Sequence, residues 1–194
     1  MRPLVTSLVL AFAVHPLSAQ GTQGAVDAAR TDAARRAELV SRSETAIAEL
    51  QTTLLARLKG ALGSGGPQAA VTVCRDEAQK LTASIGAKHA LQIGRTSDRV
   101  RNPANAPRPW AAAHVASAAG LKVADARPAV VDLPGGGVGI LRPIGTAEFC
   151  VMCHGSRDAV QSVIGPVLAA SYPKDQAVGF APGDLRGWFW AEAR

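Results

Sequence analysis

The sequence of 194 residues lacks the marks of several common protein classes. A zinc site would need a second Cys/His pair beside the single Cys-x-x-Cys, and the 3 Cys and 4 His provide none. No stretch reaches 18 consecutive apolar residues, so we expect no membrane-spanning helix. The glycine-rich stretches have neither the Gly-Lys-Ser/Thr ending of a phosphate loop nor the spacing of a dinucleotide fingerprint. No nucleophile with a nearby base and no pair of carboxylates stands out, so we do not expect an enzyme.

Methionine is scarce as well, and one of the two methionines lies inside the motif that dominates the chain. This motif is Cys150-Val151-Met152-Cys153-His154-Gly155, which is typical of covalent attachment of a c-type haem. Residues at i, i+3 and i+4 share one side of a helix, so Cys150, Cys153 and His154 can face one porphyrin. The spacing predicts one haem c, joined by two thioethers and ligated by His154. A disulfide, a redox Cys-x-x-Cys pair or half of a zinc site is the alternative.

The second axial ligand of such a haem is not obvious from the residues. Met is the common one in c-type cytochromes, but Met152 is tethered between the two cysteines and cannot reach the opposite haem face. Cys74, His89, His114 or a small exogenous ligand remain. Cys74 is the odd cysteine of three, and is either a buried free cysteine that packs like a small hydrophobe or an iron ligand. A lone His in the setting of His89 or His114 is more often a packing or surface residue.

Residues 1–19 look like a secretory signal, with Arg2 before an apolar core and small residues before an expected cleavage ahead of Gln20. We therefore expect an exported, periplasmic protein with no stable membrane span after cleavage. An uncleaved anchor or a disordered start is the alternative. The Lys and Arg behind the net charge of +6 are scattered, so the positive charge suits haem propionates and an acidic redox partner better than nucleic acid.

Helical periodicity dominates the first half of the remaining chain. Residues 24–62 predict a long helix, and the Gly-Ser-Gly-Gly-Pro stretch at 63–67 predicts a break. Residues 68–84 predict a second helix with Cys74 on its inner face. The long helix has one apolar stripe that packs against the domain or against a second copy in a homodimer, formed by Ile47, Leu50, Leu54, Leu58 and Leu62.

β-Branched and aromatic runs dominate the second half. The runs 122–133 and 138–144 are joined by Pro-Gly-Gly-Gly and predict a hairpin. Residues 158–171 predict a helix, and residues 184–192 predict a final strand. The expected fold class is α+β, an antiparallel sheet flanked by helices with a long N-terminal helix. We expect a signal at 1–19, a leader and long helix at 20–66, and a haem domain at 67–194.

A basic loop follows the second predicted helix. It contains Arg95, Arg99 and Arg101 beside Asn-Pro and Ala-Pro steps, which favour a rigid turn. Guanidinium groups bind carboxylates strongly, so this loop is a candidate site for the haem propionates. An ordinary solvated loop is the alternative.

Several segments together resemble one family, the PAS-like c-type haem domains of periplasmic monohaem proteins and sensor ectodomains. They are Val73-Cys74-Arg75, Gly94-Arg95-Thr96-Ser97, the stretch from Arg101 to Pro107, Arg142-Pro143-Ile144, the haem motif, the stretch from Tyr172 to Gly179, and Gly183-Asp184-Leu185-Arg186-Gly187. The resemblance implies a PAS-like fold with one haem c and an unusual His/Cys axial pair, which here maps onto His154 and Cys74. The chain carries no kinase, cyclase or methyl-accepting segment, so a sensor of this type would need a separate output partner.

Two functions are compatible with these observations. The first is an electron carrier or redox-responsive haem protein that meets a redox partner protein. The second is a sensor whose distal Cys74 leaves when a gas such as NO or CO binds. Electron transfer needs ligands that are retained in both oxidation states, whereas sensing needs one that changes. We favour the redox function.

Overall fold

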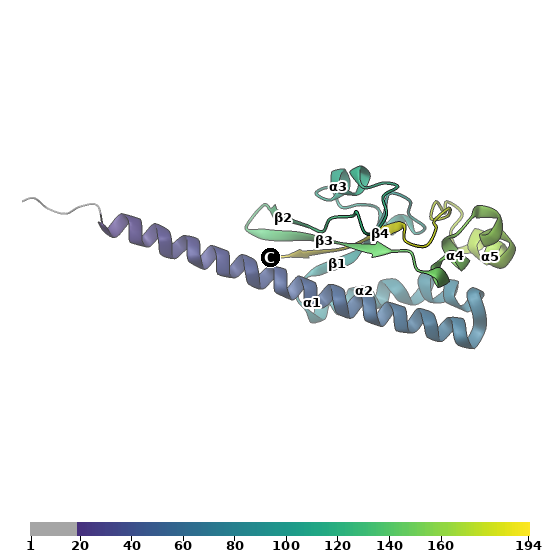
Figure 1. Cartoon of the computed structure of the whole chain (residues 1–194). Coiled ribbons are helices and arrows are strands. Elements are labelled where there is room, and N and C mark those ends of the chain that lie inside the picture. Colours follow the sequence, from purple (N-terminus) through teal and green to yellow (C-terminus); the bar gives the residue numbers. More distant parts are fainter. Residues whose placement is uncertain (1–18) are drawn as a thin grey trace, which may run out of the picture. The chain divides into compact units, whose positions relative to one another are not determined.

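The structure is a computed structural model that describes residues 19–194, with side chains described from residue 24 onward. Residues 1–18, nearly all of the expected signal sequence, lie outside the described residues. The chain divides into two units, residues 1–35 and residues 36–194. Helix α1 (Ala19–Thr72) begins in the first unit, where every described side chain is exposed. Every other element belongs to the second unit (Figure 1). Within residues 19–194, no helix is both long and apolar enough to cross a membrane.

A kink interrupts α1 where the sequence predicts a break. Gly66 has φ 70° and ψ −166°, a conformation that glycine adopts readily because it has no Cβ. Pro67 follows at the start of the next helical stretch, a position where its missing N–H is not needed. The break predicted at 63–67 is therefore confirmed, and it allows the chain to turn back.

The returning chain passes through a π-helical turn, η1 (Val73–Glu77), into helix α2 (Ala78–Lys88). Ion pairs join Arg57 to Glu77 and Glu49 to Lys88, so α2 runs antiparallel to the part of α1 beside it. This helical hairpin brings the π-helical turn opposite the second half of the long helix.

Four strands form one antiparallel sheet in the order β1-β4-β3-β2. Their bounds are β1 (Gln92–Thr96), β2 (Ala129–Leu133), β3 (Gly137–Gly145) and β4 (Leu185–Ala193). The predicted final strand is confirmed and lies at the centre, paired with both β1 and β3. The hairpin is confirmed as β2 and β3, but its predicted start at 122 is wrong: Pro128 lacks the N–H that a ladder requires, and β2 begins just after it.

Three further helices and two short 3₁₀ turns complete the fold and confirm its α+β class. Helix α3 (Ala112–Ser117) lies after η2 (Pro103–Asn105), and α4 (Val151–His154) follows η3 (Glu148–Cys150) directly. Helix α5 (Arg157–Ser171) confirms the helix predicted at 158–171. Ser156 caps it by accepting a hydrogen bond from the Ala159 amide at 3.4 Å.

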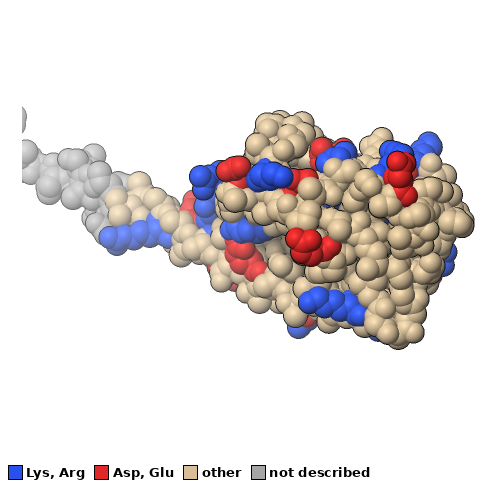
Figure 2. Space-filling model, turned by 45° about the vertical axis from the view of Figure 1, so that its right-hand side comes forward, with Lys and Arg blue, Asp and Glu red and all other residues tan. Residues whose placement is uncertain are grey.

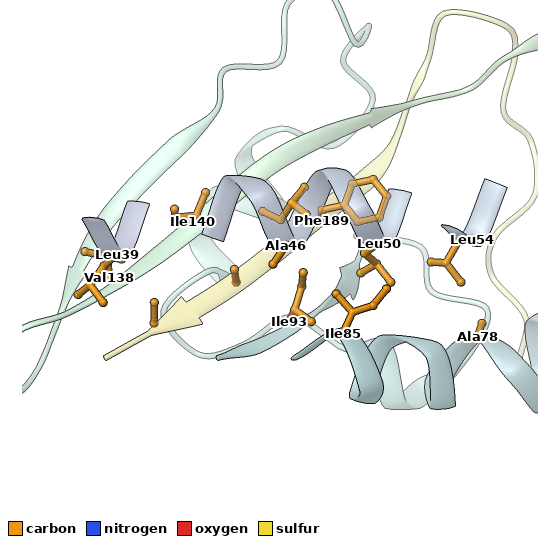
Figure 3. Packing of buried hydrophobic residues seen from close by; sticks show 13 residues of the cluster. Leu39, Ala46, Leu50, Leu54, Ala78, Ile85, Ile93, Val138, Ile140 and Phe189 are labelled. Atoms are coloured by element: carbon orange, nitrogen blue, oxygen red, sulfur yellow. The ribbon is translucent and has the colours of Figure 1, made fainter. Parts of the chain in front are cut away.

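Apolar side chains cover both faces of the sheet. On one face, Leu50 and Leu54 of α1 and Ile85 of α2 pack against Ile140 and Phe189, as Figure 3 shows. On the other face, α3 covers a second cluster around the fully buried Trp188. Each such apolar side chain contributes about 1.5–3 kcal/mol when it is fully buried. The predicted apolar stripe therefore packs against the sheet.

Charged side chains are scattered over the surface of the described structure. On the face shown in Figure 2, Lys and Arg are interspersed with Asp and Glu rather than gathered in one tract. Arg36 of α1 pairs with Asp132 of β2 at 2.7 Å, and Glu44 of α1 pairs with Arg142 of β3. These two ion pairs join α1 to the hairpin of β2 and β3.

Candidate functional site

A cavity of about 400 Å³ lies at one end of the sheet. Its walls come from α1, the π-helical turn, the ends of β1 and β3, the start of β4, and the segment that carries α4. Leu58 and Leu62, the last two members of the apolar stripe, line it beside Val73, Ile144 and Phe189. The last part of the apolar stripe therefore lines the cavity, beyond the end of the sheet. The walls of the cavity are largely apolar.

Most of the candidate site residues from the sequence line this one cavity. They are Cys74, Arg95, Arg101, Cys150, Cys153 and His154. Three other candidates, Arg99, His89 and His114, do not line it. Within residues 19–194, no three His, Cys, Asp or Glu side chains are gathered as ligands of a bare metal ion. The sulfur and nitrogen donors are thus distributed around the cavity walls.

The motif from Cys150 to His154 forms a continuous helical stretch. Cys150 ends η3, and Cys153 and His154 belong to α4. All three line the cavity, whereas Met152 is 40% exposed and points elsewhere. Burial raises the pKa of the Cys153 thiol, although the nearby Arg101 opposes the shift. Cys153 is therefore held as a neutral thiol at neutral pH.

The His154 ring is oriented by a backbone carbonyl. Its Nδ1 lies 2.7 Å from the carbonyl oxygen of Ala177, which can only accept, so Nδ1 carries the proton and donates. Nε2 is then the unprotonated nitrogen with a free lone pair. Burial lowers the pKa of His154 well below its usual value, and the positive charges of Arg186 and Arg101 lower it further. The ring is therefore neutral at physiological pH and available as a ligand.

Cys74 lies in the π-helical turn on the helical hairpin. The amide of Ala78 donates to the carbonyl of Val73, an i to i+5 hydrogen bond. π-Helical turns are rare in proteins, but those that occur are often found at functional sites. Burial raises the pKa of the Tyr172 phenol, and the neighbouring Cys74 adds to this shift. Of the three distal candidates, Cys74 alone lines the cavity that also contains His154.

The two histidine candidates are engaged elsewhere. His89 Nε2 lies 2.8 Å from Glu49 Oε2, at the far end of the helical hairpin. The His114 ring meets Trp188 edge-on, with 4.8 Å between ring centroids, on the face of the sheet that α3 covers. Neither position faces His154 across the cavity.

The three arginines of the predicted basic loop have different surroundings, and the loop prediction is wrong for Arg95, which belongs to strand β1 and pairs with Phe189 of β4. Arg95 lines the cavity, and its burial lowers its pKa while Cys74 opposes the shift. The guanidinium carbon of Arg99 lies 3.8 Å from the centroid of the Phe180 ring, and the Arg99 side chain donates to the carbonyl of Val178 at 2.8 Å. Arg101 pairs with Asp175 at 3.0 Å, and both side chains are nearly buried, 10% and 8% exposed.

Sequence reasoning assigned no role to Arg186, which also lines the cavity. Burial and the neighbouring Arg101 and Arg95 lower its pKa to about 10. Its Nε is buried without a hydrogen-bond partner, as are Thr96 Oγ1 and Arg101 Nε in the same region. Its place near the start of a strand that is otherwise mostly apolar is the signal that the sequence offers.

Residues 22–191 match the sequence model of the Tll0287-like family (Tll0287). The chain belongs to the Tll0287-like family. A similar solved structure is the crystal structure of the cyanobacterial heme-protein Tll0287, with 25% sequence identity and a TM-score of 0.58. The match covers 79% of this chain and 93% of that one. No curated protein matches the sequence.

Membership in the Tll0287-like family agrees with the haem-protein part of the resemblance stated above. The matched range begins within α1 and ends in β4, so it includes Cys74, the motif from Cys150 to His154, and Arg186. The PAS-like description of the fold stays a prediction.

Proposed function

We propose that this protein binds one haem c in the cavity, attached through Cys150 and Cys153. His154 Nε2 and Cys74 Sγ would hold its iron. The observation that carries the proposal is that two thiols, one oriented imidazole and the third cysteine all line a single, largely apolar cavity. The related protein Tll0287 is a heme-protein, which supports the same assignment.

The donor set suits such a group. When bound, a haem supplies one-electron redox chemistry. The chain holds His154 as the tautomer with a free Nε2, and it holds Cys74 on a separate element of the same cavity wall. Leu58, Leu62 and Phe189 give this cavity an apolar lining. The unpartnered Nε of Arg186 fits a group that brings negative charge.

The biological role that we favour is electron transfer or a redox response, without catalysis, together with a redox partner protein. A sensor of NO or CO is the second candidate, because Cys74 lies in a π-helical turn rather than in a regular helix. Covalent haem c is attached outside the cytoplasm in bacteria. We therefore also propose export to the periplasm through residues 1–19.

Covalent attachment is the direct test. Protein made together with haem-attachment machinery should keep one haem after denaturation, so its mass should exceed that of the mature chain by one haem. Cys150→Ala and Cys153→Ala should each lose at least half of the attached haem, because one thioether is missing. Cys74→Ala is the matched control and should keep all of it. Complete extraction of haem into acidic organic solvent from the parent protein would contradict the proposal.

Charge in the cavity wall predicts the partners of the haem propionates. Three guanidinium groups line the cavity, those of Arg95, Arg101 and Arg186, and Arg101 pairs with the buried carboxylate of Asp175. Two positive charges are left for two propionates. We therefore propose Arg95 and Arg186 as their partners.

Removing either positive charge should stabilise the ferric haem, which carries the extra charge. Arg95→Gln and Arg186→Gln should each lower the midpoint potential by about 60 mV, a tenfold change in a one-electron equilibrium. Potentiometric titration measures the shift. Arg99→Gln is the matched control, since Arg99 lies against Phe180 instead, and its shift should be less than half as large. Equal shifts in all three variants would contradict this assignment.

A further inference from the structure

One irregular segment, residues 175–180, holds the backbone around His154. Its amides at Gly179 and Phe180 donate to the carbonyls of Gly155 and His154, at 2.6 and 2.9 Å. Its Ala177 carbonyl accepts from His154 Nδ1 at 2.7 Å. The segment has no helix or strand of its own, so its position depends on what fixes its ends.

The Arg101–Asp175 ion pair fixes the first end of this segment. Asp175 Oδ1 accepts from the Ala177 amide at 2.8 Å, which closes the turn that contains Ala177. The Arg101 guanidinium holds Asp175 at 3.0 Å and also reaches the Ala177 carbonyl at 3.3 Å. Its same nitrogen donates to the Cys153 carbonyl at 2.5 Å. One guanidinium therefore joins the residue before His154 to the carbonyl that accepts from His154.

We propose that the Arg101–Asp175 pair positions the His154 imidazole and regulates its donor strength, an inference that rests on the proposed function. The pair holds the Ala177 carbonyl where Nδ1–H can donate to it, which selects the tautomer with a free Nε2. Arg101 shares that carbonyl oxygen, so it limits how strongly the oxygen accepts from the ring. A weaker acceptor makes the imidazole a weaker donor at Nε2. Arg101 and Asp175 are positioning residues, because neither touches the cavity donors except through the backbone.

The first test measures solvent exchange of the His154 ring proton directly and does not require haem. Asp175→Asn removes the charge that holds Arg101, so the turn around Ala177 should loosen. Nitrogen-edited NMR of full-length chain should then show solvent exchange of the His154 Nδ1 proton at least tenfold faster than in the parent. Arg95→Gln is the matched control: it removes a charge from the same cavity, but Arg95 makes none of the hydrogen bonds described for residues 175–180. Its exchange should stay within twofold of the parent.

The second test reads the haem-loaded protein. In Asp175→Asn, the uncompensated Arg101 and the weaker imidazole both favour the ferrous state, so the one-electron equilibrium should shift about tenfold toward reduction, or 59 mV. Arg95→Gln should shift it the opposite way. Where Asp175→Asn does not show cooperative thermal unfolding, Arg101→Lys carries both tests, because its flexible ammonium keeps the positive charge but lacks the rigid, planar guanidinium that holds these acceptors in one fixed geometry. Its His154 exchange should also be at least tenfold faster.

The outcomes separate this inference from the proposed function. Unchanged His154 exchange in Asp175→Asn, or equal acceleration in Arg95→Gln, would overturn the positioning role even where haem binds normally. A parent chain that never acquires covalent haem would overturn the proposed function, while the NMR comparison would still decide whether the pair orients the ring.

Discussion

Replacing His154 by Ala is expected to abolish the low-spin ferric spectrum while leaving the haem attached. Its ring is the only histidine among the residues that line the cavity, so its loss removes the single nitrogen donor proposed for the iron. The thioethers proposed for Cys150 and Cys153 would not depend on it. Optical and electron paramagnetic resonance spectra should therefore change from a low-spin to a high-spin pattern in most of the molecules. Added imidazole should restore much of the low-spin signal by entering the space of the missing ring.

The other two histidines within residues 19–194 provide the controls. His89→Ala removes a contact with Glu49, and His114→Ala removes an edge contact with Trp188. Both lie outside the cavity, so both variants should keep the parent's spectra. An unchanged spectrum in the His154 variant, or a lost low-spin signal in the His114 variant, would contradict the ligand assignment.

Local sequence patterns were sufficient for most of the fold. Helical spacing predicted the stripe on α1, because i, i+3 and i+4 residues lie on one side of any helix. Glycine followed by proline predicted the kink at Gly66, because one residue allows a left-handed φ and the other begins a new helical turn. The hairpin was predicted from a glycine turn between two β-branched runs, although Pro128 shortened its first strand.

The site could be predicted only where its residues are close in sequence. The spacing of Cys150, Cys153 and His154 is local, and all three line the cavity. By contrast, Arg101 and Asp175 pair across a long stretch of chain, and only the tertiary fold brings them together. The acceptor for His154 is a backbone carbonyl of Ala177, which no side-chain pattern can reveal. Arg186 was missed because its importance depends on burial by tertiary contacts.

Cys74→Ala is expected to have the largest effect on the reduction potential. A thiolate is an anionic donor that stabilises ferric over ferrous iron, and axial ligands set haem potentials over a range of about 0.8 V. The variant should therefore show a potential raised by more than about 100 mV, together with an altered ferric electron paramagnetic resonance signal. Val73→Ala is the matched control, because Val73 lines the same cavity from the same π-helical turn but has no donor atom.

Cys74→Met separates two effects on the haem: that of the ligand's negative charge and that of having a ligand at this position at all. A thioether is neutral, so this variant should stay low-spin while its potential rises nearly as far as that of Cys74→Ala. If the ferric signals of Cys74→Ala and the parent coincide, Cys74 is a packing residue and the proposed axial pair is wrong. If they differ, carbon monoxide added to the reduced parent decides between the two roles. Binding as tight as in Cys74→Ala means that Cys74 gives way on reduction and favours the sensor. If the reduced parent does not bind carbon monoxide while Cys74→Ala does, Cys74 is retained as a ligand in both oxidation states, as electron transfer requires.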